Sequence, residues 1–161
     1  MENIYVPLIL VVLFCALGCV LGETNEEGEA ESQPWRDLAT GANSNIEQAK
    51  QEVFQSEDVW HDWWKRHNTS YEYIDGKMVA TKPPEVHFSK ETILVVTLGM
   101  RSTGGYSVVF TRVHYDGETL VAHLRYTAPG PDDMVTMALT APFAIIAVPK
   151  HEGPVRFVDD K

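Results

Sequence analysis

Two short apolar runs constrain the fold more than any other feature of this chain. Residues Thr92–Leu98 form a continuous stretch of Ile, Leu and Val, which is typical of a strand covered on both faces. Phe143–Val148 is a second apolar run, closed by Pro149. The two runs predict buried strands at the centre of a β-rich domain.

A β-hairpin is expected between the two runs. Asp116-Gly117 separates two alternating segments and predicts a two-residue turn, so Tyr115 should pair with Glu118 and Val113 with Leu120. In this register one strand of the hairpin divides its side chains between a core face and a mixed, partly wet face. The core face receives Val109, Thr111 and Val113, and the mixed face receives Val108, Phe110, Arg112 and His114.

One helix is expected near the start of the domain. Ser56 is a good N-cap, and a stripe with helical spacing follows it. Such a stripe predicts packing against a sheet, and one of its three tryptophans is a candidate exposed anchor for a partner. The stripe consists of Val59, Trp60, Trp63, Trp64 and His67.

The remaining segments complete a mainly β pattern. Residues 46–54 fit a helix or a strand, with a slight preference for a strand. Residues 129–133 predict a loop, a further strand is expected from Met134 to Pro142, and residues 155–158 add a last edge strand. We therefore expect residues 46–161 to form an antiparallel β-sandwich or open barrel with one packed N-terminal helix.

The segment before this domain predicts export. Residues 1–22 contain an apolar run of roughly 28 Å as a helix, which indicates a signal peptide or a membrane anchor. Ala16-Leu17-Gly18-Cys19 resembles a lipobox and makes Cys19 a candidate for lipidation. Cleavage without lipid and a retained anchor are the alternatives. In each case we expect an exported protein held at the cell envelope, in contact with the membrane through this segment.

Charge is concentrated between this run and the helix. The segment from Glu23 to Asp58 contains ten acidic and two basic residues, and it carries most of the net charge of −10. Residues 23–45 therefore predict an acidic, disordered tether. Acidic surroundings repel phosphates, so a nucleic-acid partner is excluded.

Catalytic and metal-binding patterns are missing from the sequence. Cys15 and Cys19 are the only cysteines and both lie in the N-terminal run, so the domain has neither a cysteine nucleophile nor a disulfide. The six histidines do not form a His-Glu-x-x-His pattern, and there is no Gly-x-Ser-x-Gly motif. We expect no enzymatic activity, metal or cofactor.

A double-glycine turn follows the first apolar run and is the candidate binding site. Adjacent glycines allow the chain to bend sharply and expose backbone groups, and aromatic and guanidinium side chains flank them. The alternative is a purely structural corner with the tyrosine packed inward. The candidate partner-binding residues are Arg101, Ser102, Thr103, Gly104, Gly105 and Tyr106.

This turn, the Thr140-x-Pro142-Phe143 segment and the Trp60-x-x-Trp63-Trp64 cluster together resemble the PrcB family. The resemblance covers about residues 46–158. It implies a non-catalytic, exported subunit of a bacterial protease complex, with a secreted protease as its protein partner. One position departs, because His87 stands where the family usually has an aspartate.

Two other functions remain open. The turn also resembles, less closely, the loops of chagasin-like protease inhibitors. A small-ligand binder that uses the mixed sheet face beneath the tryptophan helix is the third hypothesis.

Overall fold

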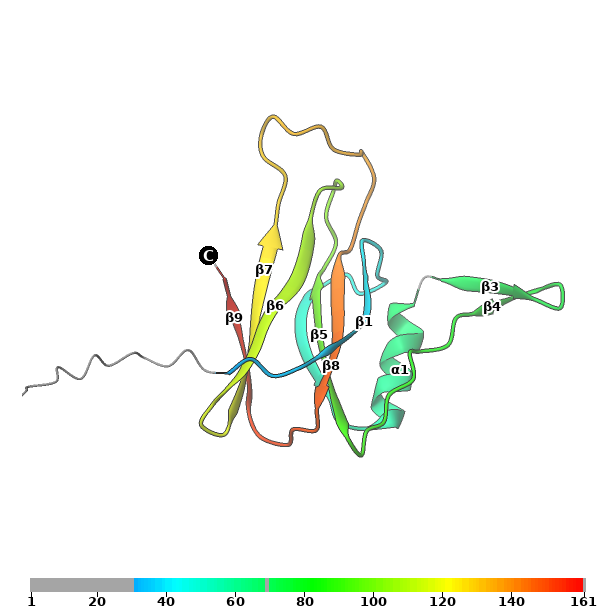
Figure 1. Cartoon of the computed structure of the whole chain (residues 1–161). Helices are drawn as coiled ribbons and strands as arrows, with labels where there is room; N and C mark the ends of the chain where they lie inside the picture. The colour runs from blue at the N-terminus through cyan, green and yellow to red at the C-terminus, as the bar shows by residue number, and fades with distance from the viewer. Residues whose placement is uncertain (1–30, 69, 161) are drawn as a thin grey trace, which may run out of the picture.

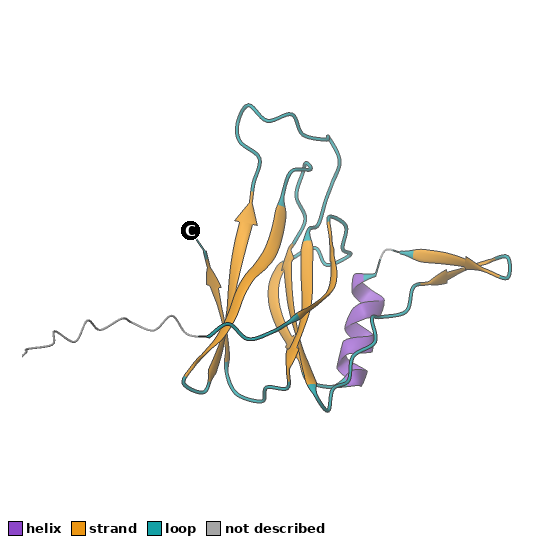
Figure 2. Ribbon diagram, in the orientation of Figure 1, coloured by secondary structure: helices purple, strands orange, loops and turns teal. Residues whose placement is uncertain are grey.

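The computed structural model describes residues 31–68 and 70–160, and contains nine strands and one helix within these ranges (Figures 1 and 2). The predicted signal or anchor segment, Cys19 and the tether up to residue 30 lie outside the described residues. The elements are β1 (Arg36–Gly41), β2 (Ala49–Phe54), α1 (Glu57–His67), β3 (Tyr71–Ile74), β4 (Lys77–Ala80), β5 (Glu91–Leu98), β6 (Ser107–Asp116), β7 (Thr119–Thr127), β8 (Phe143–Pro149) and β9 (Val155–Asp159).

Seven of the strands form two sheets that pack face to face, and α1 covers the outer face of one of them (Figure 1). The four-stranded sheet has the order β1-β8-β5-β2, and the three-stranded sheet has the order β6-β7-β9. The prediction of a mainly β sandwich with one packed helix is confirmed. One pairing differs from the antiparallel expectation, because β9 runs parallel to β7.

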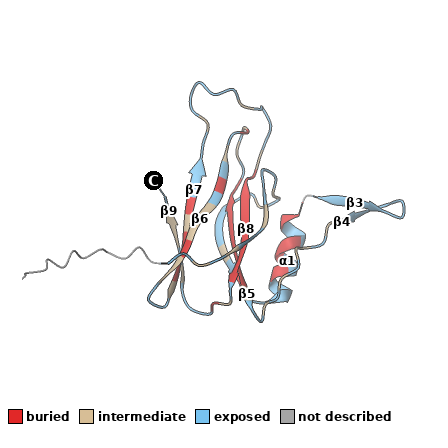
Figure 3. Cartoon of the chain, viewed as in Figure 1, coloured by how far each residue is buried: buried red, intermediate tan, exposed pale blue. Residues whose placement is uncertain are grey.

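The central strand β5 is buried on both faces, as its continuous apolar sequence predicts (Figure 3). Ile93 and Val95 pack with the tryptophans of α1, whereas Leu94 and Val96 face the three-stranded sheet. Consecutive residues of β5 therefore enter two different cores, which leaves no position for a polar surface residue along most of the strand.

The segment before residue 46 is more ordered than its composition predicts. Residues 36–41 form β1, which pairs with the edge of β8, and Gln33 N donates to Val113 O at 2.6 Å. Trp35 packs against the core between the sheets. The prediction of a disordered tether is therefore wrong for residues 36–41, because the open edge of β8 satisfies their backbone groups.

Strand β2 confirms the slight preference for a strand at residues 46–54. Helix α1 begins directly after Ser56, as expected, although the Ser56 side chain makes no capping hydrogen bond. All three tryptophans of α1 are buried, so the prediction of one exposed tryptophan anchor is wrong. Trp63 stacks on Trp60 and on His67, and Phe54 packs against Trp63 at an interplanar angle of 54°. This cluster accommodates more aromatic area than one helix face alone.

The hairpin of β6 and β7 exists, but its register differs from the prediction. Asp116 pairs with Thr119, and the turn residues are Gly117 and Glu118, with a φ of 61° at Gly117. A type II′ turn needs glycine at this first loop position. The pairing is therefore displaced by two residues from the expected one.

A β-bulge at Thr111 changes the faces of the first half of β6. Beyond the bulge Val108 and Phe110 turn into the core between the sheets, whereas Val109 is exposed. The predicted faces of these three residues are wrong, because one inserted residue reverses the alternation. The mixed face of this hairpin also lies on the side away from α1 (Figure 1), so the predicted placement of that face beneath the tryptophan helix is wrong.

No helix among the described residues is long and apolar enough to cross a membrane.

The buried His67 predicts how stability depends on pH. Its ring stacks on Trp63 with 4.6 Å between centroids, and Ser44 Oγ lies 2.8 Å from its Nδ1. Burial lowers the pKa of His67 from 6.5 to about 4. Below pH 6.5 His67 binds a proton in the unfolded chain but stays neutral in the folded one. The folded state therefore loses stability relative to the unfolded state as the pH falls from 6.5 towards 4.

Because of His67, we expect the free energy of unfolding to be about 2 kcal/mol lower at pH 5 than at pH 7. His67→Phe keeps the aromatic packing and should remove this part of the pH dependence in urea titrations. His61→Gln, at an exposed position of the same helix, should retain it. Equal pH slopes for wild type and His67→Phe would contradict the assignment.

Candidate functional site

The candidate turn lies at one end of the sandwich, beside the loop that joins β7 to β8 (Figure 1). Arg101 N donates to Thr140 O at 2.7 Å, and Thr140 N donates back to Arg101 O at 3.0 Å. Thr140 Oγ1 also donates to Thr103 O at 2.8 Å. Loop 99–106 and loop 128–142 therefore form one joined surface, which we call the loop end.

Loop 128–142 contains no strand, so the strand predicted from Met134 to Pro142 is wrong. Within this loop, Thr140 forms an isolated bridge with Arg101. The backbone of this loop bonds mainly to other loops, as Gly104 N does to Thr136 O and Ala141 N to Ala42 O, so it forms no ladder with a strand. The loop predicted at residues 129–133 is confirmed.

The two glycines of the turn are held tightly against loop 128–142. Gly104 is buried and donates from its N to Thr136 O at 3.0 Å. A Cβ at Gly104 would lie 2.4 Å from Thr136 Oγ1, and Gly105 has a φ of 89° with Pro129 close by. These contacts favour the structural alternative for both glycines: they allow the two loops to approach closely.

The exposed side chains of the loop end come mainly from loop 128–142. Met134 and Met137 are almost fully exposed, Leu139 is 68% exposed, and Met100 on the adjoining loop is 48% exposed. The sequence prediction missed these residues because it placed them in a strand. Methionines between a Pro-Gly-Pro turn and the next buried strand were the available signal.

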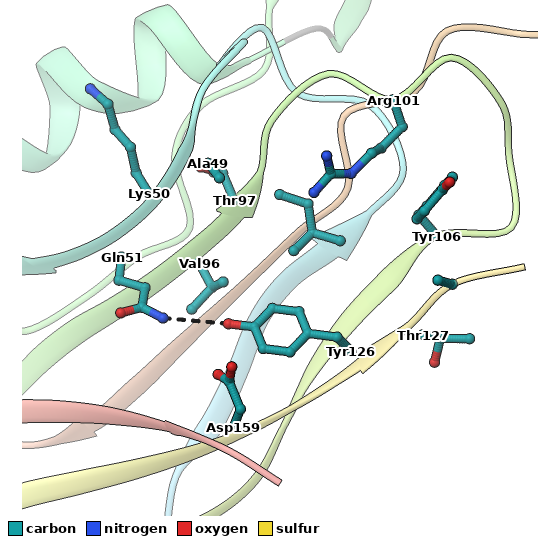
Figure 4. A pocket seen from close by; sticks show the side chains of 12 residues that line it. Ala49, Lys50, Gln51, Val96, Thr97, Arg101, Tyr106, Tyr126, Thr127 and Asp159 are labelled. Atoms are coloured by element: carbon teal, nitrogen blue, oxygen red, sulfur yellow. Dashed lines mark hydrogen bonds between the residues drawn. The ribbon is translucent and has the colours of Figure 1, made fainter. Parts of the chain in front are cut away.

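A pocket of about 560 Å³ opens next to the loop end, between the edges of the two sheets (Figure 4). Its floor is apolar and includes Val96 and Leu98 of β5. The Tyr126 ring of β7 lies across it, and Gln51 Nε2 of β2 donates to the Tyr126 hydroxyl at 3.4 Å. Arg101 and Tyr106 belong to its lining, whereas Ser102, Thr103, Gly104 and Gly105 do not.

Arg101 is the cation of this pocket. Its guanidinium is directed towards the apolar floor, whereas the Lys50 side chain points away (Figure 4). Arg101 Nε is buried without a hydrogen-bond partner among the described residues, and no carboxylate of those residues pairs with it. The Tyr106 ring, 5.5 Å from the guanidinium carbon, gives only a cation–π contact.

A tyrosine hydroxyl and a carboxylate lie towards the other end of the pocket. Burial and the charge of Asp159 raise the pKa of Tyr126 above its ordinary value, so its hydroxyl stays protonated. Asp159 lies at the end of β9, on the far side of the Tyr126 ring from Arg101 (Figure 4). Within the pocket, Arg101 and Asp159 therefore lie on opposite sides of the Tyr126 ring.

A pair of histidines lies on β6 and β7. His114 and His123 lie close, with ring centroids 5.1 Å apart, and His123 Nδ1 is 2.7 Å from Asp160 Oδ1. No group of three or more metal-ligating side chains occurs in residues 31–68 and 70–160.

The hairpin of β3 and β4 was missed by the sequence prediction, although Asp75-Gly76 is its turn signal. Both turn residues have positive φ, as a type I′ turn requires. The hairpin extends away from the sandwich and exposes apolar side chains (Figures 1 and 3). These are Tyr71, Tyr73, Ile74, Met78 and Val79.

Comparison with family models identifies the segment that carries these loops. Residues 92–149 match the family PrcB C-terminal. The match runs from β5 to β8 and includes both loops of the loop end, which confirms the resemblance expected from the sequence. Neither the comparison with curated proteins nor the comparison with solved structures found a match.

The contact of Gly104 with Thr136 predicts how the loop end can be loosened. Gly104→Ala should clash with Thr136 Oγ1 and increase proteolytic cleavage of loop 128–142 several-fold. Adding Thr136→Ala removes that oxygen and leaves the new Cβ 3.6 Å from the nearest Thr136 carbon, so the double variant should regain resistance. Cleavage that remains elevated in the double variant would contradict a steric origin.

Proposed function

We propose that this chain is a non-catalytic, exported subunit that binds and stabilises a partner protease at the cell envelope. The observation that carries the proposal is the exposed apolar loop end within the PrcB C-terminal match. The match supports a role in a protease complex, and the loop end supplies a surface suited to a protein partner.

The chemistry of the loop end supports binding. Met134, Met137 and Leu139 expose apolar side chains on one loop, and apolar side chains exposed together are typical of protein–protein interaction sites. Methionine is flexible and polarizable, so it adapts to the shape of another surface. The hydrogen bonds between the two loops limit the ordering cost on association.

Location at the envelope is part of the same proposal. The apolar run within residues 1–22 would direct export, and lipidation of Cys19 or retention of the run would hold the domain near a membrane. Attachment of the subunit would then keep a secreted protease at the cell surface.

The loop end predicts the outcome of a co-expression experiment. The full chain is produced together with each secreted protease of the same organism, and the yield of active protease is measured. Replacing Met134, Met137 and Leu139 together by serine should weaken capture of the protease by more than about tenfold and reduce its yield. The exposed Val59→Ser on α1, away from both the loop end and the β3–β4 hairpin, is the control and should leave the yield unchanged.

The same experiment separates stabilisation from inhibition, the second candidate. A stabiliser raises the amount of active enzyme, whereas an inhibitor lowers the turnover of each enzyme molecule. If the chain changes neither the yield nor the turnover of any of these proteases, both functions are contradicted.

A further inference from the structure

The pocket beside the loop end has the chemistry of a site for a polypeptide chain end. We propose that it binds the C-terminal carboxylate and the apolar last residue of an extended peptide, which pairs with the free edge of β2. This inference rests on the proposed function in one respect: it specifies which part of a protein partner the domain takes.

The first step is the unpaired guanidinium. Arg101 is fixed through its backbone by the two hydrogen bonds to Thr140, so its side chain starts from a defined position. Its buried Nε has no acceptor among the described residues. A buried donor without an acceptor is costly, and a carboxylate is the ligand whose geometry best matches a guanidinium.

The second step is the shape and polarity of the pocket. Val96, Leu98 and Ala128 offer apolar surface next to Arg101, and Tyr106 and Tyr126 add aromatic walls. A volume of about 560 Å³ accommodates an apolar side chain together with its backbone. The expected ligand therefore joins a carboxylate directly to an apolar group, as a chain end with an apolar last residue does.

The third step is the free edge of β2. Leu98 N donates to Pro142 O, on the β8 side of β5. Because backbone groups alternate along a strand, Ile93, Val95 and Thr97 direct their N–H and C=O groups towards β2. They pair with Lys50, Glu52 and Phe54. By alternation, the backbone groups of Ala49, Gln51 and Val53 point outward from the sheet, where no further strand follows β2 among the described residues.

The edge and the pocket are continuous. Ala49 and Gln51 line the pocket and also supply outward backbone groups, and Ala49 lies at the end of β2 next to Leu98, close to Arg101. A peptide added along β2 can therefore hydrogen-bond to Gln51 and Val53 while its terminal carboxylate reaches Arg101. The backbone hydrogen bonds of the added strand supply affinity, and the pocket gives specificity for a C-terminal end.

The test uses the purified full chain and an N-acetylated hexapeptide of alternating threonine and valine that ends in leucine. Calorimetric titration should show binding of the free acid and at least tenfold weaker binding of the same peptide with a C-terminal amide. Arg101→Gln should weaken binding of the acid about tenfold to a hundredfold, as expected for a charge-assisted pair. Arg125→Gln removes an exposed arginine of β7 and is the matched control.

Hydrogen exchange locates the peptide. Bound peptide should slow exchange of the Gln51 and Val53 amides and leave the opposite edge strand, β1, unchanged. Equal affinity for acid and amide, or protection that is absent from β2, would overturn the inference. Binding of octanoate without binding of the peptide would also overturn it, because the pocket would then serve small carboxylates.

These results are independent of the co-expression experiment, since the peptide titration contains no protease. If the peptide fails to bind while the chain still raises the yield of a protease, the pocket inference fails and the proposed function stands. If the peptide binds as expected but no protease responds, the proposed function fails instead.

Discussion

Burial of β5 on both faces is the constraint on which the rest of the structure depends. One face of this strand packs with the tryptophans of α1 and the other with the three-stranded sheet, so a single strand joins three layers. Its neighbours β8 and β2 are fixed by the same ladder. The end of β5 then determines where Arg101 leaves the sheet, and therefore where the loop end and the pocket lie.

The two cores differ in how they are filled. Between the sheets, small and branched aliphatic side chains such as Ala122, Val113 and Ile146 interdigitate. Beneath α1, stacked aromatic rings fill a wider gap, and Glu52 accepts a hydrogen bond from Trp63 Nε1 at 2.7 Å. The indole donor is thereby satisfied at the sheet edge, which allows a large ring to be buried without an unpaired polar group.

The central strands could be predicted from sequence because their continuous apolar runs report directly on burial. The faces of β6 could not, because the bulge at Thr111 has no local signature and its effect reaches every residue beyond it. Strand β1 was missed for a different reason. Its sequence, Arg36–Gly41, is polar and becomes a strand only because the edge of β8 is open.

In the candidate site, too, only the features with a local sequence pattern could be predicted. Arg101 and Tyr106 were found from the glycine turn between two strands, which is a local pattern. The pocket was not, since its lining comes from β2, β5, β7, β9 and the Arg101 loop, and only the packing of two sheets brings these together. The exposed methionines were hidden by a wrong strand assignment, although their neighbours Pro129-Gly130-Pro131 already excluded regular structure before them.

The identity of the pocket cation follows from its surroundings. A lysine ammonium is strongly hydrated, and an apolar floor formed by Val96 and Leu98 would disfavour it. A guanidinium is more weakly hydrated and can lie over the face of Tyr106, which compensates part of its charge. The compensation is partial, because an aromatic face provides no hydrogen-bond acceptor of carboxylate strength. Arg101 can therefore remain in the pocket at moderate cost and still gain from an incoming carboxylate, which is the balance a reversible binding site requires.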